Sequence, residues 1–152
     1  MPILIAPKLG AVSLSLKTVF TSALSTIPVY MGEPITSDVP MLFVMVGSDG
    51  DPESDAESNF QHSWQDMGHT RMREDGEIPC ALVSQTGSDL ADSVIADAFT
   101  TLQMCASALA NDPTLSGIIA GIWVTAGSER TILNSNGAGV VVPFTVNYWT
   151  IL

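Results

Sequence analysis

Two stretches of the chain have the hydrophobic spacing of amphipathic helices. Over residues 8–25, apolar side chains recur three and four positions apart and form one stripe. The same spacing continues over residues 88–110, with Ser88 as a plausible N-cap and the sequence Asn111-Asp112-Pro113 as the stop. We therefore predict a helix near the start of the chain and a second, longer helix after its midpoint.

The remaining patterns are those of strands and turns. Residues 29–31 begin a short strand, and the continuous apolar run at residues 41–46 predicts a strand buried on both faces. Further strands are predicted at residues 60–64, 69–74, 77–85, 117–126, 129–134 and 139–151. Turns are expected at Gly68, Asp75-Gly76 and Asn136-Gly137, while Pro79 and Pro143 predict edge strands or bulges.

The order of these elements favours one fold class. Helices and strands do not alternate regularly, so a parallel sheet built from βαβ units is not expected. We predict an α+β fold, with a mostly antiparallel sheet and two long helices packed on one of its faces. The 152 residues contain no internal repeat and fit a single domain spanning residues 1–152.

Charge is scarce and strongly one-sided. Only 14% of the residues are charged, against roughly 25% in an average globular protein. Because charged residues are depleted in interface cores, this favours a surface covered by other protein subunits; a neutral-polar surface is the alternative. The net charge of −11 includes no cluster of basic residues, so direct binding of a nucleic-acid backbone is not expected.

The cysteines and the apolar segments point to neither export nor a membrane. Cys80 and Cys105 fall in a predicted strand and a predicted helix, and their spacing predicts no disulfide framework or zinc site. No apolar run reaches about 18 residues. The N-terminal segment is interrupted by Lys8 and Lys17, unlike a signal peptide. We expect a chain made in the cytoplasm, without a membrane span.

Residues suited to catalysis are few. The chain has no nucleophile elbow, no phosphate-binding loop and no dinucleotide-binding glycine motif. His62 and His69 lie seven positions apart, and a pairing with Asp66 or Glu74 would suit acid–base chemistry or a metal. The alternative, which we favour, is a pair of strand-surface or interface histidines. We predict no enzyme and no cofactor.

Residues 48–57 form an acidic loop without a basic residue. The alternation of its acids resembles the start of a calcium-binding loop, but Ser54 and Phe60 occupy the positions that need glycine and glutamate. We therefore expect a solvated loop and no metal site. Its acidic residues are candidates for a surface that faces a channel or a partner: Asp49, Asp51, Glu53, Asp55 and Glu57.

Two arginines stand out in so acidic a chain. Arg71 and Arg73 are two residues apart and would share one face of a strand. In a ring of identical subunits they would pair with acids of a neighbour, together with contacts from Trp64; the alternative is pairing within their own chain.

Structural, non-catalytic motifs spread over roughly residues 27–150 give the chain a family resemblance. It resembles the tail terminator proteins of long-tailed bacteriophages and related tail-completion proteins of the head–tail joint. The residues that carry the resemblance are Val29-Tyr30, Trp64, Gly68, Glu74, Gly76, Ile78, Cys80, Gly87, Asp112-Pro113-Thr114-Leu115, Gly117, Gly139, Val141, Phe144, Val146 and Tyr148.

The resemblance implies a homo-hexameric ring in the neck of a virion. Such a ring caps the tail tube, ends its polymerisation and joins it to the head–tail connector or stopper protein, while genomic DNA passes through the channel without specific binding. The resemblance brings no catalytic residue. A head-closure ring remains the nearest alternative, followed by a small enzyme using His62 and His69, and by a binding module whose acidic loop holds calcium. A tube subunit is disfavoured, because such subunits have fewer long helices.

Overall fold

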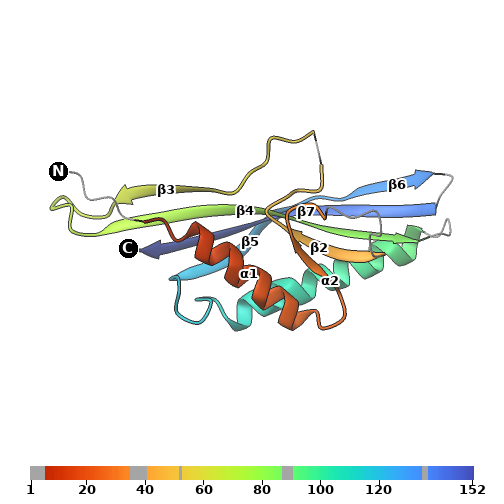
Figure 1. The fold of residues 1–152 in the computed structure, drawn as a ribbon, viewed down its shortest axis with the longest axis horizontal. Helices are drawn as coiled ribbons and strands as arrows, with labels where there is room; N and C mark the ends of the chain where they lie inside the picture. Colours follow the sequence, from red (N-terminus) through yellow and green to blue (C-terminus); the bar gives the residue numbers. More distant parts are fainter. Residues whose placement is uncertain (1–5, 35–40, 52, 87–90, 135–136) are drawn as a thin grey trace.

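A computed structural model describes residues 6–34, 41–51, 53–86, 91–134 and 137–152. They form one seven-stranded sheet and two helices (Figure 1). The elements in chain order are α1 (Leu9–Ala23), β1 (Val29–Met31), β2 (Leu42–Val46), β3 (Asn59–Trp64), β4 (Met72–Thr86), α2 (Ala91–Asn111), β5 (Gly121–Gly127), β6 (Arg130–Asn134) and β7 (Gly137–Ile151). The expected Ser88 cap and the residue Asn136 lie outside the described residues.

The two longest strands, β4 and β7, form the centre of the sheet. They pair antiparallel from Arg73 opposite Ile151 to Thr86 opposite Ala138. On the outer side of β4 lie β3 and β2, with β1 beyond β2; on the outer side of β7 lie β5 and β6. The strand β1 runs parallel to β2, so the sheet is mixed. Seven strands in a mixed sheet and two helices fit the predicted α+β class, while the parallel pair of β1 and β2 departs from the antiparallel arrangement that was predicted.

One apolar core joins both helices to the sheet. Alternate residues of β4 and β7, such as Leu82 and Val142, point into this core. Both predicted helical stripes contribute, with Leu16 and Phe20 from α1 and Val94 from α2 fully or almost fully buried. Burying a large apolar side chain contributes about 1.5–3 kcal/mol, so this core supplies the main stabilisation of the fold.

The predicted edge position of Pro79 is wrong, because β4 is a central strand. On its outer side, β3 pairs with β4 as far as Glu77 and β2 takes over at Cys80. Pro79 lies in the interval between them, and its carbonyl accepts a hydrogen bond from the Gly47 amide at 2.7 Å. Since the N–H and C=O of a strand residue point to the same side, the amide hydrogen that proline lacks would face this interval.

Pro143 occupies the corresponding place in β7. On the outer side of this strand, β6 pairs as far as Val141 and β5 takes over at Phe144. The Pro143 carbonyl accepts a hydrogen bond from the Ser128 amide at 3.0 Å. Both prolines are therefore tolerated in central strands because each faces a place where the neighbouring strand changes.

The hairpin predicted at Asp75-Gly76 is also wrong, because β4 runs unbroken through both residues. The turn occurs earlier, between β3 and β4, and includes Gly68 as expected. A Cβ atom on Gly76 would lie 2.2 Å from the ring of Tyr148. Glycine is needed at this position because an aromatic ring packs against the backbone, and not because the chain turns here.

The strand β5 begins later than predicted, at Gly121 instead of residue 117. Three successive residues after α2 have positive φ angles: Leu115 (47°), Ser116 (59°) and Gly117 (91°). Such a left-handed run cannot belong to a strand, so the apolar residues around Ile118 lie in a turn.

Candidate interaction surfaces and a buried carboxylate

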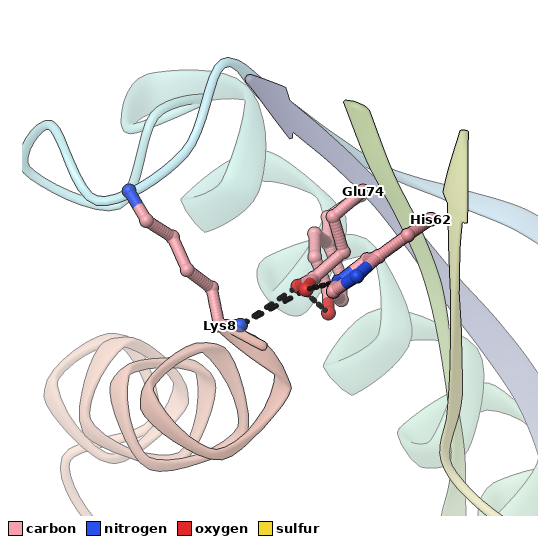
Figure 2. Close-up of polar contacts among 4 residues, drawn as sticks. Lys8, His62 and Glu74 are labelled. Carbon is pink, nitrogen blue, oxygen red and sulfur yellow. Dashed lines mark hydrogen bonds and ion pairs between the residues drawn. The ribbon is translucent and has the colours of Figure 1, made fainter. Parts of the chain in front are cut away.

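The carboxylate of Glu74 is completely buried on the helix side of β4 and has several polar contacts. The backbone amide of Lys8 donates to both of its oxygens, at 3.1 and 2.9 Å. The Nε2 atom of His62 lies 2.7 Å from Oε1, and the hydroxyl of Tyr148 donates to Oε2 at 2.7 Å. Figure 2 shows Lys8 and His62 converging on the carboxylate from the start of α1 and from β3.

This cluster fastens the beginning of α1 to the sheet. The ammonium group of Lys8 also donates to the carbonyl of Ile118 at 2.9 Å, so the same residue ties α1 to the turn that follows α2. Burial, followed by the hydrogen bond to Glu74, raises the pKa of Tyr148. The phenol therefore stays protonated and keeps donating to the carboxylate. A buried carboxyl group with four polar contacts of this kind holds elements in place.

The two histidines of the sequence do not form a common site. His62 contacts Glu74 and packs against Phe60, with 5.1 Å between ring centres. His69 instead lies against Trp64, with ring centres 5.0 Å apart. Within the part of the chain that the structure describes, no group of three or more histidine, cysteine, aspartate or glutamate residues is arranged to hold a metal ion.

Both cysteines are buried, and both are free thiols. Burial raises the pKa of Cys80, and it raises that of Cys105 to about 12. Neither residue is present as a reactive thiolate at neutral pH.

The opposite face of β4 carries an ion pair at the surface. The Arg73 guanidinium donates three hydrogen bonds to the Asp75 carboxylate, at 2.8–3.0 Å, and lies 4.6 Å from the ring centre of Trp149. Arg73 is thus paired within its own chain, which was the alternative to a subunit contact. Arg71 does not share its strand face, because it precedes β4 and lies in the turn, 3.8 Å from Asp66.

The β3–β4 turn ends in a group of exposed apolar and basic side chains, which we call the hairpin tip: Trp64, Met67, His69 and Arg71. Met67 is completely exposed, and Trp64 is 47% exposed. The side chain of Arg71 is 70% exposed. The turn itself is well organised, because the Asp66 carboxylate accepts hydrogen bonds from the Thr70 amide at 2.8 Å and from its hydroxyl. In Figure 1 this turn lies at the left end of the molecule.

The acidic loop lies across the face of the sheet that carries Arg73. A Cβ atom added to its residue Gly50 would lie 3.0–3.3 Å from the side chains of Val141, Ala81 and Met45, so the loop backbone runs close to the second, smaller apolar cluster that these residues form. In Figure 1 the loop rises above the sheet, on the side away from the helices. We predicted a fully solvated loop, but part of the loop packs against the sheet.

Carboxylates of the loop organise its own backbone. Asp49 accepts a hydrogen bond from the amide of Asp51, and Asp51 accepts one from the amide of Glu53, each at 3.0 Å. Asp51 also lies 3.9 Å from the guanidinium of Arg130, next to β7. These local contacts shape the loop without gathering its acids around a common point.

A groove separates the loop from the sheet, and we call it the acidic groove. It comprises two adjoining hollows of about 400 and 370 Å³, which share Ala56, Pro79 and Thr145 as lining residues. Four acidic residues line it: Asp49, Asp55, Glu57 and Glu77. Three of the five acidic loop residues predicted to face a partner therefore meet a concave surface.

The helix α2 is long and apolar enough, by length and composition, to cross a membrane. In this fold it packs on β4 and β7 through an inner stripe that includes Val94, Ala98 and Leu109. Its outer side exposes Phe99 and Met104, each at 40%.

The sequence named Glu74 as a possible partner of a histidine and the acidic loop as a partner surface, but it did not predict that Glu74 is buried or that the loop borders a groove. A signal for the former was present, since Glu74 continues the inward-facing alternation of Gly76, Ile78 and Cys80. An acid in register with buried positions indicates a partner that satisfies it. No spacing pattern indicated the amide of Lys8 as that partner.

Comparison with known proteins gives a fold but no family. No family model matches the chain, and no curated protein matches it. Among solved structures, the fold is similar to that of a chain in the virion of a native gene transfer agent (GTA) particle. The TM-score is 0.51 and the sequence identity is 10%, with 94% of this chain and 97% of the other covered. The two chains thus share a fold along nearly their whole length.

Proposed function

We propose that this chain is a structural protein of a phage-like virion and acts, as a single domain, at the joint between head and tail. Copies would assemble into a hexameric ring that caps the tail tube and ends its polymerisation. The tube protein would contact one side of the ring, the connector or stopper protein the other, and DNA would pass through the channel. The observation that carries the proposal is the end-to-end similarity in fold to a chain of a virion particle.

The surface of the chain supports an assembling subunit. Ten large hydrophobic side chains among the described residues are exposed, including Trp64, Met67 and Trp123. Tryptophan and methionine are enriched at protein interfaces, and charged residues are depleted in the cores of such interfaces. The low share of charged residues supports the same conclusion.

The electrostatics suit the passage of DNA. Each copy has a net charge of −11, so a ring of copies would create a strongly negative field. Such a field would keep a DNA backbone from adhering to a channel wall. The acidic loop, with Asp49, Asp51, Glu53, Asp55 and Glu57, would face the channel or a partner subunit. This assignment fails if a structure of the ring places the loop on its outer rim.

The test combines the purified protein with purified tail tubes and with connector-bearing heads. Its mass, alone and with tubes, is measured by sedimentation, and the tubes are viewed by electron microscopy. Rings or caps at one end of each tube, and tubes of fixed length when polymerisation proceeds in its presence, would support the proposal. Binding to connectors but never to tube ends would favour the head-closure role. A monomer that ignores both would refute a place at the joint.

A further inference from the structure

The hairpin tip is an exposed surface of the composition that protein interfaces bury. Trp64, Met67 and Arg71 are all largely or partly open to solvent at one end of the molecule. Tryptophan, methionine and arginine are enriched at interfaces, and tryptophan and arginine dominate their energetically important positions. Leaving such a tip in water costs solubility, so a partner surface is expected to cover it.

The tip differs in charge from the rest of the chain. Residues 64–71 contain one arginine, Arg71, and one aspartate, Asp66, so the tip carries no net charge. The other 15 acids of the chain lie elsewhere, against four lysines and arginines, one of which, Arg73, is already paired with Asp75. A second copy therefore offers the exposed side chain of Arg71 an acidic surface.

The acidic groove provides such a surface, and it is concave where the tip protrudes. Asp49, Asp55, Glu57 and Glu77 line it, while the partly exposed Pro143 gives it an apolar contact surface. An arginine and a tryptophan would find acidic side chains and a proline ring there. The groove begins beside Asn59, at one end of β3, and the tip begins at Trp64, at the other end. The length of the strand, about 17 Å, keeps a tip from reaching its own groove.

We propose that the hairpin tip of one copy docks into the acidic groove of a second copy of this chain. The two surfaces differ, so the contact is heterologous and leaves one free tip and one free groove at the ends of any short chain of copies. Such contacts close into a ring when the rotation between copies permits it. The inference deepens the proposed function, on which it rests only for the ring that this contact would help to build.

The first experiment joins the two surfaces chemically. One batch of protein carries Met67→Cys and another carries Ala56→Cys in the groove, and the mixture is treated with a short bis-maleimide. The native thiols are buried and their pKa values are raised, so they react slowly. The matched control replaces Ala56→Cys by Ala106→Cys, which is exposed on α2. We expect at least tenfold more 67–56 than 67–106 product by peptide mass spectrometry.

The second experiment exchanges charges across the contact. Arg71→Glu in the Met67→Cys copy should lower the yield of 67–56 product about tenfold, as expected for like charges brought together. Glu57→Arg in the Ala56→Cys copy should restore most of the yield. Both residues are exposed, so neither change is expected to affect folding. Equal yields in all four combinations would overturn the proposal.

The outcomes separate this inference from the proposed function. Rings on tube ends without the 67–56 product would overturn the docking contact and leave the role at the joint intact. The 67–56 product without any binding to tubes or connectors would support the contact and count against the role. Loss of tube capping in Arg71→Glu, with no link between copies, would assign the tip to the tube protein and refute a second copy as its occupant.

Discussion

Three consecutive residues of β4 show how one strand supports two kinds of charge. Glu74 points toward the helices and is completely buried, with the Lys8 amide, His62 and Tyr148 bound to its carboxylate. Its neighbours Arg73 and Asp75 point to the opposite face and form an ion pair that remains partly exposed. The geometry of both groups is good, yet their energetic importance differs greatly.

The difference follows from solvation. Removing a buried charge from a set of bonded partners leaves those partners without an acceptor in a place that water does not reach. At the surface, water replaces whatever is lost, and an exposed pair contributes only about 0–1 kcal/mol. Side by side, the two groups show that the number of hydrogen bonds alone does not decide stability.

The largest effect is expected for Glu74→Ala. This change leaves the Tyr148 hydroxyl and the Lys8 amide without their acceptor, and we expect a loss of about 3–5 kcal/mol in the free energy of unfolding. Chemical denaturation monitored by tryptophan fluorescence measures it. The control is Glu77→Ala, an exposed acid of the same strand, which should change stability by less than about 0.5 kcal/mol. Equal effects of the two changes would contradict our account of the cluster.

Gly76→Ala tests the same region by adding a methyl group next to the Tyr148 ring, and it should cause the next largest loss in the free energy of unfolding. The new methyl group would lie 2.2 Å from the Tyr148 ring, which must then move away from Glu74. Overpacking of this kind costs about 1–3 kcal/mol. Gly10→Ala is the matched control, because Gly10 lies in α1 with nothing within 4 Å of the added carbon. That change should stabilise the protein by about 0.5–1 kcal/mol, so two losses of similar size would refute the steric explanation.

Arg73→Ala sharpens the comparison from the surface side. The ion pair with Asp75 and the contact with the Trp149 ring are both lost, and we expect a cost below about 1 kcal/mol. The emission of Trp149 should change even so, since a cation is removed from beside its ring. A loss as large as that of Glu74→Ala would show that this pair is shielded from water after all.

The smallest effect is expected from pH at the hairpin tip. The hydrogen bonds from Thr70 hold the pKa of Asp66 below its usual value of 3.8. The stabilisation that this group gives is therefore complete above the unfolded pKa and is lost as pH falls through the folded pKa. Carboxyl NMR should show Asp66 titrating below 3.8, and Thr70→Ala should move its midpoint upward. An unchanged midpoint would exclude Thr70 as the cause.

Local periodicity was sufficient to predict most elements of the fold. The stripes of both helices, the buried run of β2 and the alternation of β3 and β7 correspond to elements of the structure. Prediction failed where the role of a residue depends on a contact with a residue far away in the sequence. Asp75-Gly76 has the composition of a hairpin turn, but Gly76 makes room for Tyr148, which lies 72 positions later in the chain. Nothing within a short window of sequence reports such a contact.

The candidate surfaces were predicted only in part, for a similar reason. The acidic loop was recognised from composition, whereas its packing through Gly50 onto Ala81 and Val141 depends on the assembled sheet. Arg71 and Arg73 look equivalent in the sequence, yet one lies in a turn and the other pairs with Asp75. The pairing of His62 with Glu74 was one of the alternatives considered. The sequence could not show that this carboxylate would also bind the Lys8 amide.

The long ladder between β4 and β7 has a mechanical consequence. It runs from Arg73 opposite Ile151 to Thr86 opposite Ala138, and its outer neighbours are each interrupted beside a proline. A pull along these two strands in opposite directions would load all of their hydrogen bonds together, in shear, and not one after another as in unzipping. The β4–β7 ladder is therefore expected to resist such a pull as one unit, because the changes of neighbouring strand beside Pro79 and Pro143 do not interrupt the ladder itself.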